Sequence, residues 1–573
     1  MFKRIIALVL VLTMAVGLTS CIGEIDLFDK LQQLFAPSPE EGGEEGGEEG
    51  GDEVGDEVGD YDWSKTTLNV ELSEHTCSAE LSSGARRYLA GGDPDANDPI
   101  DRAVRDRNKA AETYTKTKIN YTYLPDVPTY GWGKNMTRIT SETMSYSDTS
   151  TDIYVNFMYD MIAASLSGDF ANLNSVTFEG NERENYFRFT AEDYNPTADD
   201  EGYMYDLMTS MSLSTRKMYV LASDYLADVS RAFFVVPVNM EMIDDIRIKY
   251  VKEYDYDGNG KFDAEDFFNI IWSNDWNFEA VKALSIAVAK QVGETPDLME
   301  DTHGFALGST VSGIHASAIL YGSGIEVAQR HLNEITGIYD VSYPMDTGAF
   351  GDFCKALADL FSADGVTNVN EGSLTDTPSM KIANLFADDH ILLGGIICAG
   401  NLEQSEYQDM SGDGFGVAPV PIYRAFDESL DLDEKGRNRY YHTAVYNGAK
   451  CASIAYRTTK FEQCTAWLNY QTVNSVDVME EYWHKVVGNY ESNVEVMTML
   501  RANVCTVFEK SFEDQIRRRA NTNDMRWDYL IRMGKTWIHD ESDIDTSYIT
   551  AVEIKWSIND IGLIFKSLND RED

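Results

Sequence analysis

The feature that most constrains the fold is an alternation of short apolar runs with longer amphipathic patterns, from about residue 65 onward. Residues 152–160 (DIYVNFMYD) are predicted to be a buried strand leading into a loop, and 278–292 repeat apolar residues at helical spacing. Strands separated by helices predict an α/β protein with mostly parallel sheets. Further predictions are a strand turning helical after Asn239 in 231–246, strands in 414–423 and 440–456, and a helix at 461–473.

Length and charge narrow the class of protein. The chain has 573 residues, enough for two or more lobes, and 43% of them are hydrophobic, as in folded globular proteins. The formal net charge is −49. Such a surface repels phosphate backbones and anionic membranes, so nucleic acid is excluded as a partner.

The N-terminal residues predict export and lipidation. A basic stretch (MFKR) precedes an apolar run too short to span a bilayer, as in a secretory signal peptide. The run closes on LTSC, which resembles the bacterial lipobox. On this interpretation residues 1–20 are a lipoprotein signal peptide and Cys21 is the lipidated first residue. An ordinary secretory signal with a chance cysteine is the alternative.

Residues 21–63 are predicted to be a tether. After a short amphipathic stretch they are dominated by Gly, Glu and Asp, which leave little to bury and keep the chain extended by self-repulsion. The six other cysteines match no zinc or CxxC spacing, so no disulfide is assigned. Cys354, Cys398 and Cys451 lie among apolar or small residues and are predicted to be buried thiols.

Residues 255–266 (DYDGNGKFDAED) have the spacing of an EF-hand calcium loop. Oxygen-bearing side chains occupy positions one, three, five, nine and twelve, glycine occupies the sixth, and apolar Phe262 the eighth. The carbonyl at position seven also ligates in such loops. One structural Ca²⁺ is therefore predicted, with a chance acidic turn as the alternative. The predicted ligands are Asp255, Asp257, Asn259, the carbonyl of Lys261, Asp263 and Asp266.

An ordered set of segments carries a family resemblance. It includes 98–124, 152–175, FFVVPVNMEMIDD, FADDHILLGGIICAGNLEQ, GDGFGVAPVPIY and the run that begins YHTAVYNGAK. Together with LTSC, these segments resemble the extracellular solute-binding lipoproteins of ABC sugar importers, the maltose-type family 1. The resemblance covers roughly 95–490 and is thin outside that range.

The resemblance implies a fold and a division of the chain. The family fold has two α/β lobes joined by a hinge, with the ligand in an interlobe cleft. Applied to this chain, the resemblance assigns residues 64–235 and 397–455 to the N-terminal lobe. It assigns residues 236–396 and 456–573 to the C-terminal lobe. The chain would cross between the lobes near Phe234–Pro237, Ile396–Ala399 and Ala455–Arg457.

The resemblance also nominates ligand-binding residues. Sugars present apolar faces and hydroxyl groups, so aromatic plates and polar side chains suit them. In the family, the loop after the DIYVN strand (152–156) faces the cleft, and so do the crossover segment CAGNLEQ and the AVYNGAK segment. The nominated residues are Tyr159, Asp160, Asn239, Asn401, Glu403, Tyr446 and Asn447, with Trp132 and Trp483 as possible plates.

These features together predict a binding protein and not an enzyme. The expected function is a lipid-anchored receptor on the extracellular face of the membrane that binds a carbohydrate and delivers it to an ABC permease. Two alternatives remain open from the residues alone. One is a surface glycoside hydrolase, because 96 Asp and Glu residues make paired carboxylates inevitable. The other is a lipoprotein that only adheres to polymers.

Overall fold

The computed structural model describes most of residues 63–505 and neither 1–62 nor 506–573. The signal peptide, Cys21 and nearly all of the predicted tether therefore lie outside the described residues, as do Trp132 and Asn447. The internal gaps of three residues or more are 75–94, 128–133, 145–149, 191–201, 213–216, 309–317, 326–328, 334–337, 343–348, 370–377 and 411–413.

The first part of the chain builds a four-stranded sheet in the order β15-β3-β1-β2. Strand β1 pairs in parallel with β2 and β3, whereas β15 runs antiparallel to β3. The elements before the first crossing are β1 (Thr67–Ser73), α3 (Pro99–Thr115), β2 (Lys118–Leu124), α4 (Asn135–Met144), β3 (Ile153–Phe157), α5 (Met158–Ser167), β4 (Thr177–Phe178), β5 (Asn181–Glu182), η4 (Arg188–Thr190), α6 (Tyr205–Ser210) and α7 (Ala227–Arg231).

The next part builds a six-stranded sheet in the order β10-β7-β11-β6-β12, with β13 also on β6. Its first elements are β6 (Phe234–Asn239), η5 (Met240–Asp245), η6 (Ile248–Tyr250), η7 (Lys252–Tyr254), α8 (Ala264–Trp272), α9 (Phe278–Val288), β7 (His303–Gly308), β8 (Gln329–Asn333), β9 (Ile338–Ser342), α11 (Ala349–Ser362), β10 (Val366–Val369), α12 (Pro378–Ala387) and β11 (Ile391–Leu393).

The last part of the described chain contributes to both sheets. Its elements are β12 (Ile397–Cys398), η9 (Ala399–Glu403), α13 (Ser405–Gln408), β13 (Phe415–Pro419), α14 (Glu428–Asp431), β14 (Thr443–Ala444), β15 (Lys450–Ile454), α15 (Phe461–Val473), α16 (Val476–Val487), α17 (Glu491–Ala502) and β16 (Val504–Cys505). The first sheet is mostly parallel as predicted, with β15 antiparallel to β3. The second sheet is mixed, because β6 pairs antiparallel with β11, β12 and β13.

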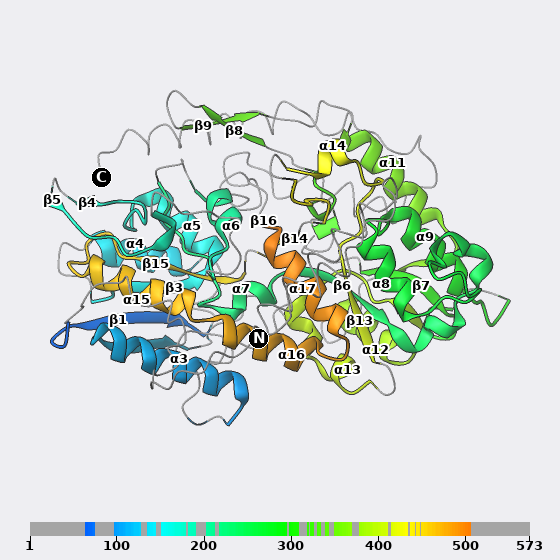
Figure 1. Ribbon diagram of the computed structural model, residues 1–573, viewed down its shortest axis with the longest axis horizontal. Coiled ribbons are helices and arrows are strands. Elements are labelled where there is room, and N and C mark those ends of the chain that lie inside the picture. Colours follow the sequence, from blue (N-terminus) through cyan, green and yellow to red (C-terminus); the bar gives the residue numbers. More distant parts are fainter. Residues whose placement is uncertain are drawn as a thin grey trace, which may run out of the picture. The chain divides into compact units, whose positions relative to one another are not determined.

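We call the four-stranded sheet with its helices the first half, and the six-stranded sheet with its helices the second half. In Figure 1, β1, β3 and β15 lie with α3 and α15, and β6, β7 and β13 lie with α8, α9 and α12. Buried apolar side chains from both halves form one continuous cluster. Trp467 belongs to the first half, and Trp276 to the second.

Local sequence explains several elements. Asp98 caps α3 by accepting a hydrogen bond from the backbone nitrogen of Ile100, and Pro99 supplies the first helical position. Helix α15 occupies the predicted 461–473. The 152–160 prediction is partly wrong: β3 is fully buried as expected, but it runs directly into helix α5 and not into a loop.

The first predicted crossing, near Phe234–Pro237, coincides with β6, whereas the later changes of half lie away from the predicted crossings. It enters the second half at β6 and stays there through β12 and β13, so 397–419 does not join the first sheet. It returns at β15, and α15 packs on α3. The backbone nitrogen of Ala455 still bonds Asp152 of the first half, and the chain leaves only through α16, which contacts both α3 and α17.

Candidate functional site

Three carboxylates of the 255–266 loop lie together. One oxygen each from Asp255, Asp257 and Asp266 can be chosen so that all three lie within 4.8 Å of one another. Carboxylate oxygens are the ligands that Ca²⁺ prefers, and positions one, three and twelve are EF-hand ligand positions. The backbone therefore gathers three of the predicted ligands.

The loop is shaped by its own hydrogen bonds. Asp255 Oδ2 accepts from the backbone nitrogen of Gly260 at 3.0 Å, and Gly260 has a φ of 81°, which only glycine adopts readily. Asp257 Oδ1 accepts from Asn259, whose Oδ1 accepts from Lys261. These contacts turn the chain tightly enough to bring distant side chains of the loop together.

The end of the loop is the beginning of helix α8. Asp263 and Asp266 form a capping box, and Asp266 Oδ1 also accepts from the backbone nitrogen of Tyr256. Phe262 is buried and fixes the loop to the core. Asp263 Oδ1 is occupied by helix capping, and Asp263 is not part of the three-carboxylate group.

One carboxylate oxygen of the loop shows whether the loop suits a cation. Asp255 Oδ1 is buried and accepts no hydrogen bond, and a carboxylate oxygen has no proton of its own to donate. Burial raises the pKa of Asp266, with the carboxyls of Asp263 and Asp257 adding to the rise. A buried, donorless oxygen among carboxylates fits a divalent cation, so the residues present suit the predicted Ca²⁺.

Two predicted sugar-site residues lie where β3 ends and α5 begins. Tyr159 is half-buried, whereas Asp160 is fully buried and accepts from the backbone nitrogen of Met136 at 3.4 Å. Helix α4 begins at Asn135, so Asp160 supports its first turn. The geometry gives Asp160 a structural contact and leaves Tyr159 partly accessible.

Asn239 lies apart from these residues. Its Nδ2 donates to Phe386 O and to Asp389 Oδ1, both at 2.8 Å, and its Oδ1 accepts from Glu241. The whole side chain is thus used to cap η5 and to join β6 to the end of α12.

The other described candidates lie where the two halves meet, a region we call the junction. It comprises α7, η9, α16 and residues 443–446 and 448–450. Asn401 and Glu403 are on η9, Tyr446 is bonded through its backbone nitrogen to Ala232, and Trp483 is on α16. Asn401, Tyr446 and Trp483 are buried.

Buried charges at the junction are paired with one another. Arg231 donates through Nη1 to Asp228 Oδ1 at 2.7 Å and through Nε to Glu403 Oε1 at 2.9 Å. The same Glu403 oxygen accepts from the hydroxyl of Tyr482 at 2.9 Å. Lys450 Nζ lies 3.6 Å from Asp228 Oδ2. Among the described residues, two cations and two anions therefore balance where α7, η9, β15 and α16 meet.

The pKa of Asp228 reflects this balance. Burial alone would raise it, but Lys450 and Arg231 outweigh burial, and the pKa lies below its ordinary value. Arg231 is completely buried, and a Cβ added at Gly400 would lie 3.3 Å from the Arg231 Cβ. Close packing of η9 on α7 thus holds the ion pairs in place.

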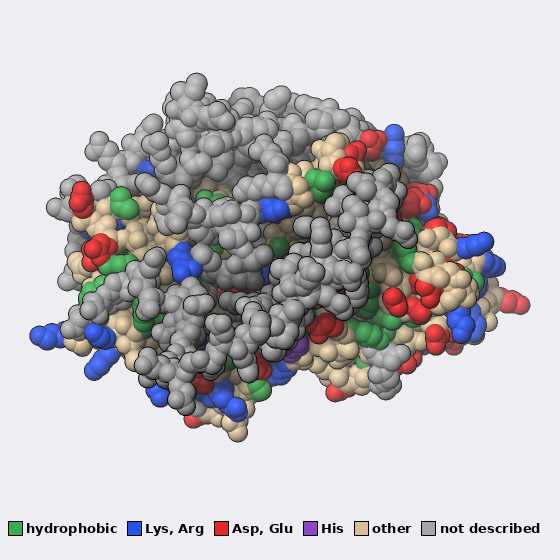
Figure 2. Space-filling view, in the orientation of Figure 1, with side chains coloured by type: hydrophobic (Ala, Val, Ile, Leu, Met, Phe, Trp, Pro, Cys, Tyr) green, Lys and Arg blue, Asp and Glu red, His purple; other side chains and the backbone are tan. Residues whose placement is uncertain are grey.

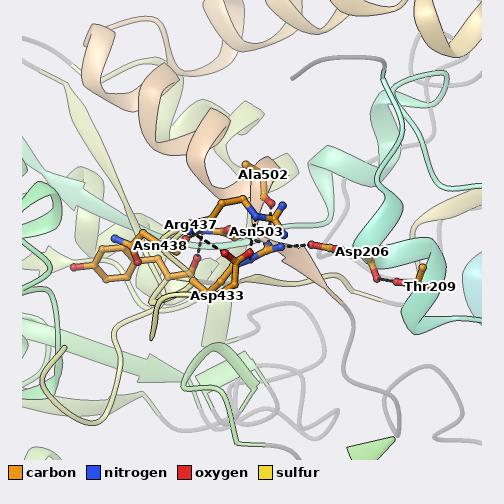
Figure 3. Close-up of polar contacts among 9 residues, drawn as sticks. Asp206, Thr209, Asp433, Arg437, Asn438, Ala502 and Asn503 are labelled. Atoms are coloured by element: carbon orange, nitrogen blue, oxygen red, sulfur yellow. Dashed lines mark hydrogen bonds and ion pairs between the residues drawn. The ribbon is translucent and has the colours of Figure 1, made fainter. Parts of the chain in front are cut away.

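Arginines of the second half also pair with aspartates of the first. Arg501, at the end of α17, contacts Asp224 through two hydrogen bonds of 3.1 and 2.6 Å. Arg439 donates to Asp206 of α6 at 2.7 Å and to Asn503 at 3.1 Å. Figure 3 shows Asp206 and Asp433 approaching this point from different segments. Helix α17 is itself fixed to β13 by Asn493.

Sequence reasoning found Glu403 but missed Asp228, Arg231 and Lys450. Asp228 and Arg231 are three residues apart on α7, and Lys450 interrupts an apolar strand pattern. A charged residue inside a buried run is the signal that would have marked them, because buried charges need partners.

Other predictions have simple outcomes. Cys398 and Cys451 are buried free thiols as predicted, and so is Cys464; the side chain of Cys354 is not described. No helix among the described residues is long and apolar enough to cross a membrane. On the face shown in Figure 2, acidic and basic side chains are interspersed over the part that holds α9 and β7.

The solved structures similar to this chain include sugar-binding proteins of ABC transporters. The galacto-N-biose/lacto-N-biose I-binding protein of Bifidobacterium longum has a TM-score of 0.44 and 10% identity, covering 87% of this chain and 98% of that one. The sugar-binding protein MalE of Xanthomonas citri has a TM-score of 0.42 and 9% identity, covering 88% of this chain and 98% of that one. The maltose–maltodextrin binding protein of Alicyclobacillus acidocaldarius has a TM-score of 0.39 and 11% identity, covering 87% of this chain and 100% of that one.

No family model and no curated protein matches the sequence. The three TM-scores given above lie below 0.5, so what the chain does has to be inferred from its own residues.

Proposed function

We propose that this protein is a lipid-anchored extracellular receptor that binds a carbohydrate between its two halves and delivers it to an ABC importer. The N-terminal sequence supports export and anchoring, and the ordered segments quoted above support the receptor class. The proposal assigns no catalytic residue.

The observation that carries the proposal is the path of the chain through the junction. The chain passes between the halves before β6, again before β15, and a third time along α16. A protein built this way has two sheet-centred halves joined by a few segments, which suits opening and closing around a ligand. The predicted residues Glu403, Tyr446 and Trp483 lie at this junction, and Tyr159 follows β3, the strand paired with β15.

The test is a thermal-shift screen of the full chain with mono- and oligosaccharides, including maltose, maltotriose and raffinose. Because a ligand that binds only the folded state stabilises it by about 2.7 kcal/mol at a hundredfold excess over Kd, a saturable rise in Tm is expected. The sugar should be recovered intact. Hydrolysed sugar would replace the proposal with the glycosidase alternative, and no response to any sugar would remove it.

Tyr159→Ala provides the site test, since this side chain is half-buried and its loss should leave the fold intact. Tyr250→Ala is the matched control, a tyrosine exposed on η6 of the second half. Only the first change should abolish the shift. Equal binding by both variants would contradict the assignment of Tyr159 to the sugar site.

We also propose one structural Ca²⁺ in the 255–266 loop. Asp255, Asp257 and Asp266 would hold it, with Asn259 and the carbonyl of Lys261 completing the set. The ion would neutralise the gathered carboxylates, and the chain's own residues would then fix the start of α8.

A further inference from the structure

The first half contains a buried cation without an anionic partner. Arg107 of α3 is 6% exposed. Its Nη1 donates to Tyr225 O at 3.1 Å and to Ser475 Oγ at 2.8 Å, and its Nη2 donates to Asn108 Oδ1 at 3.2 Å. All three acceptors are neutral, and no carboxylate among the described residues forms an ion pair with Arg107.

The nearby carboxylate of Asp224 is already engaged. It is the acidic side chain whose charge acts on Arg107, but both its oxygens accept from Arg501. Burial lowers the pKa of Arg107 to about 10, so the guanidinium is still charged at neutral pH. An uncompensated buried charge destabilises the folded state.

Several buried polar atoms around Arg107 have no hydrogen-bond partner. The Arg107 guanidinium carbon lies 5.3 Å from the centre of the Tyr225 ring. The Tyr225 and Trp467 rings meet edge-on with their centres 5.5 Å apart. Helix α15 packs on α3 and carries Trp467 and Gln471 four residues apart. The unpartnered atoms are Arg107 Nε, Tyr121 OH, Tyr225 OH, Trp467 Nε1, and Gln471 Nε2 and Oε1.

The chemistry of these atoms indicates what is missing. The Arg107 and Trp467 nitrogens and the Gln471 amide nitrogen are donors only, and the two phenols can donate. Native proteins rarely leave buried polar atoms unsatisfied. Ordered water would satisfy the hydrogen bonds and leave the positive charge uncompensated. A small anion would accept the hydrogen bonds and also compensate the charge.

We propose that a small monovalent anion, with chloride as the probe, binds between α3 and α15 at Arg107, Tyr225, Trp467 and Gln471. It would accept hydrogen bonds from the unpartnered donors and balance the guanidinium. This site lies within the first half and is independent of the sugar-binding proposal.

The experiment is thermal unfolding of the full chain at constant ionic strength, with chloride replaced stepwise by gluconate, which is too large for a buried site. Chloride should raise Tm saturably, multiplying the folded-to-unfolded ratio by about 100 at a hundredfold excess over Kd. Crystals grown with bromide should show an anomalous peak beside Arg107. Equal Tm in both salts, with no peak, would overturn the proposal.

Variants assign the effect to the cluster. Arg107→Met should lose the chloride response, whereas Arg102→Met, which removes an exposed arginine from the same helix, should keep it. Gln471→Leu retains the charge and should shift the response to higher chloride, which covers the case in which Arg107→Met does not fold. A response that persists in Arg107→Met, or that Arg102→Met also loses, would contradict the assignment.

Discussion

The junction and the 255–266 loop handle charge in opposite ways. At the junction, Arg231 and Lys450 are buried against Asp228 and Glu403, so the charges balance within the chain. In the loop, three carboxylates gather and one buried oxygen has no donor. Among the described residues the junction charges are balanced within the chain, whereas the proposed Ca²⁺ would balance the loop with a cation from the medium. The contrast yields three predictions.

The largest effect is expected from breaking the balance at the junction. Arg231→Met leaves Asp228 and Glu403 short of a partner in a buried setting, and removing one member of a buried ion pair costs about 3–5 kcal/mol. Denaturant unfolding should show this loss. Arg102→Met, at an exposed site, is the control and should change stability by less than about 0.5 kcal/mol. Equal stability of the two variants would show that the junction ion pairs do not matter.

Completing the loop should have a smaller effect. Calcium should raise Tm, because at a hundredfold excess over Kd it adds about 2.7 kcal/mol to the free energy of unfolding. EDTA should reverse the change. Asp255→Asn should lose the response. Glu265→Gln removes the same charge from an exposed position of the loop that supplies no predicted ligand, and it should retain the response. A calcium response that is equal in both variants would place the ion elsewhere.

The smallest effect is a pH dependence at the junction. Because the folded-state pKa of Asp228 lies below its ordinary value of 3.8, its contribution is present above that value and is lost as pH falls through the depressed pKa. Stability curves of the wild type and Asp228→Asn should therefore differ at neutral pH and converge in acid. A constant difference down to the acid limit would mean that Asp228 does not titrate as described.

How much the sequence could predict depended on how local each feature is. The three gathered carboxylates were predicted because all of them lie within twelve consecutive residues, whose spacing sets the geometry. Helix α15 was predicted for the same reason. The junction was largely missed because Asp228, Arg231, Glu403 and Lys450 meet only after distant segments fold together.

The errors have physical causes too. Tyr159 and Asp160 were expected in a loop because the family resemblance implies a loop after the DIYVN strand. Both lie on helix α5, and the buried Asp160 accepts a hydrogen bond from the start of α4. Residues 397–419, which were assigned to the first half, join the second sheet instead because β12 and β13 find their antiparallel partner in β6. Pairing across more than 150 residues leaves no trace in local periodicity.

Trp276 gives the loop an optical signature. Asp266 caps the helix in which Phe267 follows, and the Phe267 ring meets the Trp276 ring edge-on with centres 5.6 Å apart. The Trp276 indole nitrogen donates to Pro419 O in a fully buried environment. Movement at the start of α8 should therefore change the surroundings of the buried Trp276 ring. Tryptophan fluorescence can then report in real time whether the loop has bound Ca²⁺.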